Sequence, residues 1–296
     1  MPPIESTSPT FDTLAIVGVG LMGGSLALAA KQSGLAKRVI GLGRTQSKLD
    51  SAVELGILDA GTTSVAELAE AQFIVVCTPV DRIVADVQSV MNVVGDHAVV
   101  TDVGSVKQPV CDVLGTQFPR QFVGSHPLAG SEKGGFQHSE VDLYRGRKCV
   151  VTPLSDNSLQ AVQVVEQFWT TLGMDVQCMS AEEHDRILAV TSHLPHVAAA
   201  ALASLLTEHE APFAATGFRD TTRVAHGEAD LWTAILQQNS GHVGQEIGRL
   251  INELSQYKQA LETNDAENLR SLLESGCAGR RLFESVFKNG RNAWTS

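Results

Sequence analysis

A glycine-rich segment near the N-terminus limits most strongly how this 296-residue chain can fold. The apolar run 14–17 has the composition of a short buried strand, and Gly18, Gly20 and Gly23 follow it at once. Residues 25–33 then have the pattern of a helix. A G-x-G-x-x-G motif between a strand and a helix is typical of dinucleotide-binding βαβ units, which are built on a parallel sheet.

Each glycine of this motif has its own expected role. Gly18 makes the tight turn, Gly20 lets the backbone approach a pyrophosphate, and Gly23 lets the helix pack close to the strand. The N-terminus of the helix then faces the phosphates. The alternative is a structural turn without a nucleotide. The predicted cofactor-binding residues of this loop are Gly18, Gly20, Leu21, Met22 and Gly23.

The residues after the second predicted strand, 38–42, bear on which cofactor binds. NAD-binding units place an acid there, which binds the ribose 2′-hydroxyl. This chain instead has Arg44, Thr45 and Ser47, and a guanidinium with hydroxyls suits a 2′-phosphate. We predict NADP as the favoured cofactor and NAD as the alternative, which would bind if Arg44 only stacks on the adenine.

The remainder of the chain divides into two parts. Further apolar strands are predicted at 73–77, 98–102, 122–123, 149–151 and 176–178, and helices at 47–55, 80–91 and 159–172. This alternation predicts an α/β fold with a doubly wound Rossmann-type sheet covered by helices on both faces. Strand signals then vanish and helical periodicity dominates. We therefore predict a dinucleotide-binding domain over residues 1–180 and an all-helical domain over residues 181–296.

Charge and cysteine content exclude several kinds of partner. The formal net charge of -11 argues against nucleic acid or an anionic membrane surface. The five cysteines have no zinc-ligand spacing, so we predict no metal site and free thiols in a reducing cytoplasm. Residues 1–10 lack the features of a signal peptide, and the longest apolar tract, 197–206, is too short to span a bilayer. We expect a cytoplasmic protein.

Three segments follow predicted strands, where doubly wound sheets bind their ligands. Thr78 and Pro79 are expected to lie along the nicotinamide ribose. Ser105 either bonds a substrate hydroxyl or caps the following helix. In the third segment, Gly124 and Pro127 frame His126 in a stiff loop. Because imidazole titrates near neutral pH, His126 is expected to accept a proton, the alternative being a structural hydrogen bond.

The helical part adds two groups of polar residues. His193 and His196 share a helix face near Pro195, which would kink or restart the helix, and they suit a carboxylate substrate better than a metal. Asp185 lies two turns before His193, where it either holds an arginine or faces solvent.

A glycine-led loop over 217–223 carries Arg219 and Arg223. Two arginines in an acidic protein suggest a carboxylate clamp, because a guanidinium donates two parallel hydrogen bonds to a carboxylate. The alternative is an ion pair with Asp220 or Asp185.

Six motifs in order resemble the prephenate/arogenate (cyclohexadienyl) dehydrogenase family of tyrosine biosynthesis. They are GVGLMG, CTPV, TDVGSVK, GSHPLAG with SEKGG, SHLPH and GFRDTTR, and the resemblance covers residues 12–285. It implies an oxidoreductase that decarboxylates prephenate to 4-hydroxyphenylpyruvate while hydride passes to NAD(P)+. It also implies that the helical domain binds substrate and forms a homodimer.

The resemblance assigns roles to individual residues. His126 matches the catalytic histidine that takes the proton of the ring C4 hydroxyl, and Ser105 matches the serine that helps hold that hydroxyl and His126. The residues expected to bind or border the substrate are Arg223, His196, His193, Ser131, Glu132, Asp185 and Trp232.

Three alternatives stay open at this point. His196 favours prephenate, because family members restricted to arogenate can lack it, but an arogenate-preferring or dual enzyme is the alternative. A β-hydroxyacid dehydrogenase or an imine reductase would instead carry a lysine or aspartate where this chain has His193 and His196. A regulatory protein that binds NADP without turnover is the alternative of another class. Tyrosine is a possible feedback inhibitor.

Overall fold

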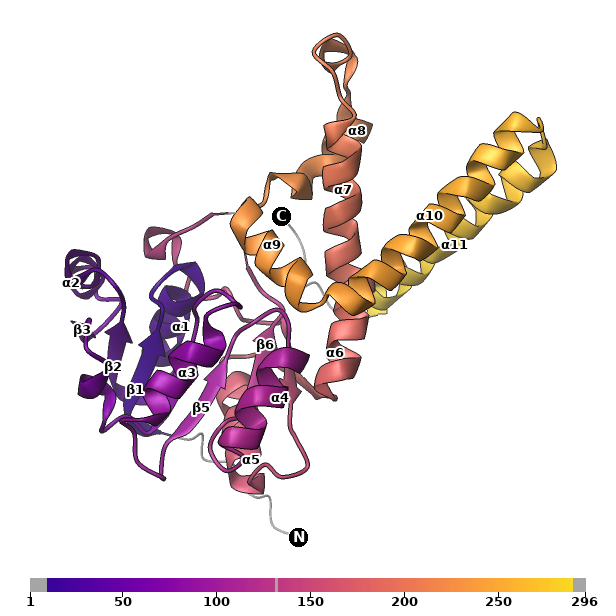
Figure 1. The fold of residues 1–296 in the computed structure, drawn as a ribbon. Helices are drawn as coiled ribbons and strands as arrows, with labels where there is room; N and C mark the ends of the chain where they lie inside the picture. The colour runs from indigo at the N-terminus through magenta and orange to yellow at the C-terminus, as the bar shows by residue number, and fades with distance from the viewer. Residues whose placement is uncertain (1–9, 131–132, 290–296) are drawn as a thin grey trace. The chain divides into compact units, whose positions relative to one another are not determined.

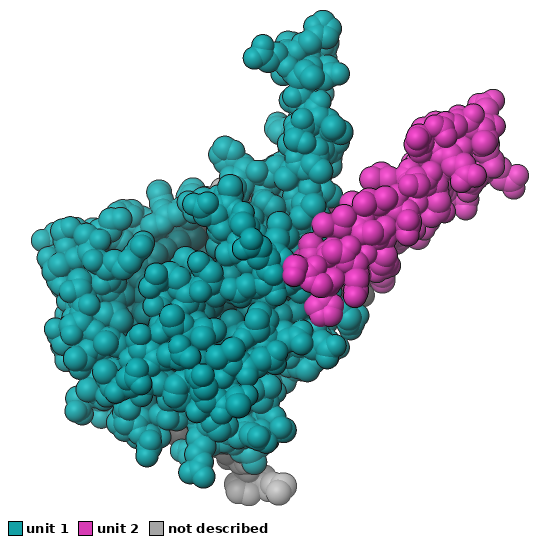
Figure 2. Space-filling model, viewed as in Figure 1, with its two compact units in different colours: residues 1–239 teal, residues 240–296 magenta. Residues whose placement is uncertain are grey.

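The computed structural model describes residues 10–130 and 133–289. The chain forms two compact units, residues 1–239 and residues 240–296 (Figure 2). The first unit therefore includes several helices beyond residue 180. The boundary that we place at residue 180 stays a prediction.

A five-stranded parallel sheet with the order β3-β2-β1-β4-β5 forms the centre of the first unit (Figure 1). Its strands are β1 (Phe11–Val17), β2 (Ala36–Leu42), β3 (Ala60–Thr62), β4 (Phe73–Val76) and β5 (Val99–Asp102). Ile16 of β1 pairs with Gly41 on one side and with Val75 on the other. This topology confirms the predicted Rossmann-type sheet.

Helices cover both faces of the sheet because side chains alternate along each strand. Leu14 and Ile16 lie in one apolar core, while Ala15 and Val17 lie in another on the opposite face. The first core includes residues of α1 (Leu21–Gln32), α2 (Gln46–Glu54) and α5 (Leu159–Thr171). The second includes residues of α3 (Ile83–Met91) and α4 (Gln108–Gln117), with η1 (Val65–Leu68) at its edge.

A second sheet with the order β6-β7-β8 follows in the chain. Its strands are β6 (Gly124–Pro127), β7 (Lys148–Thr152) and β8 (Asp175–Cys178), and η2 (Phe136–His138) precedes β7. β6 runs antiparallel to β7, so the predicted all-parallel pattern does not hold here. The expected loop around His126 was wrong too, since all four residues of β6 are buried strand. Pro127 is tolerated because β6 is an edge strand.

Helices make up the rest of the first unit. They are α6 (Ala181–Leu188), the π-helix η3 (Ala189–His193), α7 (Leu194–Ser204), η4 (Ala211–Phe213), α8 (Thr216–Thr222), η5 (Arg223–His226) and α9 (Ala229–Gln238). The predicted glycine-led loop at 217–223 is wrong, because it is helix α8 running into η5. The helix does not restart at Pro195: the π-helix η3 ends at His193 and α7 begins at Leu194, so the helical stretch Ala181–Ser204 changes type just before the proline.

The second unit is a helical hairpin of α10 (Ser240–Glu262) and α11 (Ala266–Asn289). Asn264, in the turn between them, has a φ of 53°.

One helical stretch among the described residues, Ala181–Ser204, is long and apolar enough to cross a membrane by length and composition alone. It contains the buried side chains of Asp185, His193 and His196. Ionisable side chains are rare in membrane-spanning helices. The absence of a membrane partner stays a prediction.

Candidate active site

The glycine loop between β1 and α1 is open to a ligand at one of its three glycines and tightly packed at the other two. Gly18 has a φ of 92°, and a Cβ on it would lie 2.9 Å from the Thr78 Cγ2. A Cβ on Gly20 would meet nothing within 4 Å, so this position is open. A Cβ on Gly23 would overlap the carbonyl oxygen of Gly18 and lie 2.9 Å from the Ile16 Cγ2. These contacts match the steric roles predicted for the three glycines.

The N-terminus of α1 fits the phosphates of a dinucleotide. Helix α1 has neither a side-chain cap nor an acidic residue in its first turn, so its first N–H groups stay available to an anion. Leu21 and Met22 begin this helix. Thr78 Oγ1 is buried and has no hydrogen-bond partner among the described residues. An unpartnered hydroxyl beside the glycine loop is expected where a ligand supplies the partner.

The predicted 2′-phosphate residues surround the start of α2. Arg44, Thr45 and Ser47 are exposed, and Thr45 is the N-cap residue. The first turn of α2 contains no acidic residue, so nothing in it repels an anion.

His126 lies in β6 with its side chain almost wholly buried. Its Nδ1 is 2.8 Å from Nε2 of His184, whereas its Nε2 has no hydrogen-bond partner among the described residues. Burial lowers the pKa of His126 well below its ordinary value of 6.5, and His184, Lys107 and His193 lower it further. The imidazole is therefore neutral at neutral pH and can accept a proton.

A buried polar network holds β6 against the end of β5. Lys107 Nζ forms an ion pair with Asp102 and donates a hydrogen bond of 2.9 Å to the carbonyl oxygen of Ser125. The Ser125 hydroxyl lies 2.6 Å from the Asp102 carbonyl oxygen and accepts a 3.0 Å hydrogen bond from Trp169. Hydrogen bonds to both the carbonyl and the side chain of Ser125 thus fix the residue that precedes His126.

Asp185 and the unpredicted His184 lie together in α6. Ser180 begins this helix by accepting a hydrogen bond from the Glu183 amide. His184 Nδ1 lies 2.7 Å from Asp185 Oδ1, and both side chains are fully buried. The expectation that Asp185 holds an arginine or faces solvent is therefore wrong. Its assignment to the substrate stays a prediction.

Asp185 also caps α4. Its carboxylate accepts hydrogen bonds of 2.8 Å from the backbone amides of Lys107 and Gln108. The alternative role of Ser105 as the cap of this helix is therefore wrong. Ser105 is half-buried in the loop between β5 and α4, and within the described residues no hydrogen bond joins it to His126.

Trp232 of α9 brings the two histidines of the SHLPH motif together. Its indole stacks on the imidazole of His196 with ring centroids 3.5 Å apart, and it meets His193 edge-on at 6.3 Å. His193 is also bonded through Nδ1 to Asn239 at 3.0 Å, and burial lowers its pKa to about 4. Burial lowers the pKa of His196, opposed by a hydrogen bond to the Val224 backbone.

The two arginines of the predicted clamp differ in their partners. Arg219 pairs with the adjacent Asp220 at 2.9 Å, as the alternative interpretation proposed. Arg223 is exposed and has no hydrogen bond or ion pair among the described residues. It directly precedes Val224, whose backbone bonds His196. Of the two arginines, only Arg223 has a guanidinium without a partner among the described residues, and its role in a carboxylate clamp stays a prediction.

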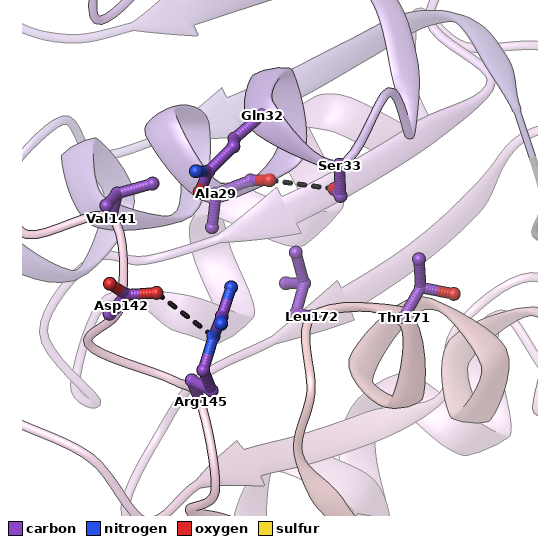
Figure 3. A pocket seen from close by; sticks show the side chains of 8 residues that line it. All are labelled: Ala29, Gln32, Ser33, Val141, Asp142, Arg145, Thr171 and Leu172. Atoms are coloured by element: carbon purple, nitrogen blue, oxygen red, sulfur yellow. Dashed lines mark hydrogen bonds and ion pairs between the residues drawn. The ribbon is translucent and has the colours of Figure 1, made fainter.

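Some predictions fall outside this cluster. Ser131 and Glu132 lie outside the described residues. Within residues 10–130 and 133–289, no group of three or more His, Cys, Asp or Glu side chains is arranged to hold a metal ion. A surface pocket of about 220 Å³ is lined by Ala29, Ser33, Asp142, Arg145 and Leu172, among others (Figure 3). None of its lining residues is a predicted site residue.

Comparison with known protein families shows which family this chain belongs to. A family model described as the prephenate dehydrogenase nucleotide-binding domain matches residues 26–178. A second, described as the prephenate dehydrogenase dimerization domain, matches residues 180–275. The chain belongs to the prephenate dehydrogenase family. This chain aligns with most of the length of each of the three family members described next.

Two curated members illustrate the similarity of sequence. Prephenate dehydrogenase of Bacillus subtilis is 34% identical over 87% of this chain and 72% of its own length. Cyclohexadienyl dehydrogenase of Zymomonas mobilis is 31% identical over 88% of this chain and 92% of its own length.

A solved member of the prephenate dehydrogenase family illustrates the similarity of structure. The enzyme of Aquifex aeolicus, in complex with hydroxyphenyl propionate and NAD+, is 32% identical to this chain. The two align with a TM-score of 0.88 over 94% of this chain and 100% of the other.

Proposed function

We propose that this chain is an NAD(P)-dependent prephenate dehydrogenase that makes 4-hydroxyphenylpyruvate and carbon dioxide in tyrosine biosynthesis. The observation that carries the proposal is the imidazole of His126, which is neutral through burial and which, within the described residues, is hydrogen-bonded through Nδ1 alone. Such a group serves as a general base. Membership of the family supplies the reaction in which that base acts.

In the proposed reaction His126 takes the proton of the C4 hydroxyl on Nε2. The oxidant would be a nicotinamide, which when bound would take up the hydride of C4. The bond between C1 and the ring carboxylate breaks, and its electron pair enters the ring as carbon dioxide leaves. The ring oxygen regains the proton from His126, which restores the base. The substrate therefore loses one hydride and one carbon dioxide overall.

The residues around Trp232 are proposed to hold the other end of the substrate. Arg223 carries an exposed guanidinium, which suits a carboxylate of the pyruvyl side chain. His196 is fixed by its stack on Trp232 and is proposed to lie near that side chain, as is His193. Ser105 is proposed to bond the C4 hydroxyl, since Asp185 and not Ser105 caps α4. The roles of Ser131 and Glu132 in substrate binding remain part of the proposal. Asp185 is buried and bonded to His184 and to the start of α4, so it is proposed to shape the site without touching the substrate.

For the cofactor, we propose a preference for NADP over NAD. Arg44, Thr45 and Ser47 are exposed after β2, where an NAD-binding unit would carry an acid. The glycine loop with Thr78 and Pro79 is proposed to hold the remainder of either cofactor.

For the assembly, we propose a cytoplasmic homodimer formed by the helical region, without a nucleic acid or membrane partner. Helices α10 and α11 expose large apolar side chains, including Ile251, Leu254, Leu261, Leu273 and Leu282. Exposed apolar stripes of this kind are typical of a face that another chain covers. Tyrosine is proposed as a feedback inhibitor.

An initial-rate assay that crosses prephenate and arogenate with NAD and NADP tests these proposals. We expect the highest kcat/KM with prephenate and NADP. Higher kcat/KM with arogenate would replace the proposed substrate, and higher kcat/KM with NAD would replace the proposed cofactor. Folded protein that binds NADP but reduces none with either substrate would contradict the enzyme and favour a regulatory protein.

A further inference from the structure

A chain of three buried side chains runs from the predicted base into the interior of the protein. His126 Nδ1 lies 2.8 Å from His184 Nε2, and His184 Nδ1 lies 2.7 Å from Asp185 Oδ1. The three residues are at most 9% exposed, and His126 comes from β6 whereas the other two come from α6. Such a chain, sealed from water, couples the protonation of its members.

The hydrogen bonds define where each proton lies. Both oxygens of Asp185 accept hydrogen bonds from backbone amides, and a carboxylate oxygen that accepts has no proton to give, so His184 Nδ1 donates to Asp185. Burial lowers the pKa of His184, which makes it neutral and leaves Nε2 without a proton. Nε2 of His184 therefore accepts from Nδ1 of His126. This puts the proton of neutral His126 on Nδ1 and leaves Nε2 as the basic nitrogen.

The far end of the chain is anchored by a helix. The backbone amides of Lys107 and Gln108, at the start of α4, each donate 2.8 Å to one oxygen of Asp185. These bonds and the helix N-terminus favour the negative charge and prevent the carboxylate from turning. Asp185 can therefore keep His184 in a single tautomer.

The other titratable groups near His126 do not take the place of His184 as its hydrogen-bond partner. Lys107 is paired with Asp102 and bonds the Ser125 carbonyl, so its ammonium faces the strand backbone. His193 bonds Asn239 through its Nδ1. Both add to the electrostatic environment of His126, but within the described residues only His184 hydrogen-bonds its ring.

We propose that His184 and Asp185 are positioning residues that keep the proton of neutral His126 on Nδ1 and share the proton that Nε2 receives. The inference rests on the proposed function of His126 as the base. When Nε2 takes the substrate proton, the proton on Nδ1 can move to His184 Nε2. The positive charge then lies on His184, next to Asp185, and returns by the same path when the ring oxygen is protonated.

The first test reads the tautomer directly and needs no substrate. In 15N NMR spectra of the full-length protein labelled at histidine, we expect His126 and His184 to be protonated on Nδ1. In Asp185→Asn, the amide can donate to His184 Nδ1, which reverses the chain and moves the His126 proton to Nε2. A His126 protonated on Nε2 in the unmodified protein would overturn the proposal.

The second test measures turnover in the same variants. Asp185→Asn should lower kcat by on the order of 10²-fold or more with KM little changed, because His126 then presents an N–H to the substrate. The acidic limb of its kcat/KM profile should also move to lower pH by about one unit, since the imidazolium loses its carboxylate. An unchanged profile would contradict the shared proton.

Two substitutions at His184 distinguish the effect of its hydrogen bond to His126 from the effect of its size. The amide oxygen of His184→Gln can still accept from His126 Nδ1, so this variant should retain more turnover than His184→Leu. Equal losses of kcat in the two variants would contradict the positioning role.

A matched control comes from the same sheet. Thr152 is buried in β7 and donates to the Gly124 carbonyl oxygen at 3.2 Å, without touching the histidine chain. Thr152→Val should keep the His126 tautomer and kcat even if it unfolds more readily. A loss of kcat in Thr152→Val equal to that in Asp185→Asn would show a purely structural effect. An inactive unmodified protein with the expected tautomers would instead contradict the proposed function alone.

Discussion

The imidazole of His196 lies flat on the indole of Trp232, with ring centroids 3.5 Å apart and ring planes 9° from parallel. The two residues come from α7 and α9, and the backbone between these helices passes so close that a Cβ on Gly227 would lie 3.0 Å from His196 Cε1. His196 therefore has little freedom to rotate. Packing against Trp232 and Gly227 therefore holds the His196 imidazole in place.

Loss of the Trp232 ring should weaken substrate binding through His196. An aromatic pair of this kind contributes about 0.5–1.5 kcal/mol, so Trp232→Ala should raise the KM for prephenate by about 2- to 12-fold. Trp232→Phe keeps an aromatic face and should change KM less. Steady-state kinetics of both variants check this, and an unaltered KM in Trp232→Ala would show that the stack does not serve binding.

Removal of the base should stop turnover without releasing the cofactor. His126→Asn cannot accept the hydroxyl proton, so kcat should fall by about 10²–10⁴-fold. The dissociation constant of NADP should stay the same, because the glycine loop proposed to bind the phosphates joins β1 to α1, whereas His126 belongs to β6. Fluorescence titration with the cofactor supplies that control. Turnover within tenfold of the unmodified protein would refute the role of His126.

Local patterns were sufficient to predict most of the nucleotide-binding fold. The helix predicted at 159–172 is α5 (Leu159–Thr171), and its apolar residues recur on one face. Two features had no such signal. β3 is only three residues long and lacks an apolar run, and Gly124 and Pro127 have low strand propensity although β6 contains both.

Site residues could be predicted from the sequence only where they belong to a short motif typical of a known chemistry. His126, His193 and His196 stand in short motifs with glycine or proline, which draws attention to them. His184 lies 58 residues from His126 in sequence, and their contact depends on how α6 packs beside β6. No local periodicity encodes such a long-range contact. Asp185 likewise has its main partners 77 and 78 residues away, at the start of α4.

Substitution of Arg223 should weaken substrate binding, whereas substitution of Arg219 should not. Arg223→Ala should raise the KM for prephenate by about 10- to 100-fold, since a hydrogen bond to a charged group contributes about 1.5–3 kcal/mol. Arg219→Ala is the matched control, because its guanidinium is engaged with Asp220 at the surface. Initial rates of both variants test this. Similar KM values in the two would argue against the clamp.

The buried histidines should make the protein less stable in mild acid. Burial lowers the pKa of His126, His184 and His193, the last to about 4, so the folded chain binds fewer protons than the unfolded chain below about pH 6.5. Their stabilising contribution is complete above that pH. The free energy of unfolding should then fall, by up to about 1.4 kcal/mol per pH unit for each imidazole.

Denaturant unfolding between pH 8 and pH 5 measures this slope. His193→Gln removes one of the three groups, so its unfolding free energy should depend less steeply on pH whatever its stability at pH 8. The same slope in His193→Gln as in the unmodified protein would exclude His193 as a contributor.

The proposed preference for NADP predicts that Arg44 binds the 2′-phosphate of this cofactor. Arg44→Gln should raise the KM for NADP by about tenfold or more, because a charge-assisted hydrogen bond to the 2′-phosphate is lost, while the KM for NAD should change little. Arg38→Gln is the matched control: it is exposed on β2 six residues earlier, which is about 20 Å along an extended strand. An equal effect of Arg44→Gln on both cofactors would mean that Arg44 stacks on the adenine, since both cofactors carry that ring.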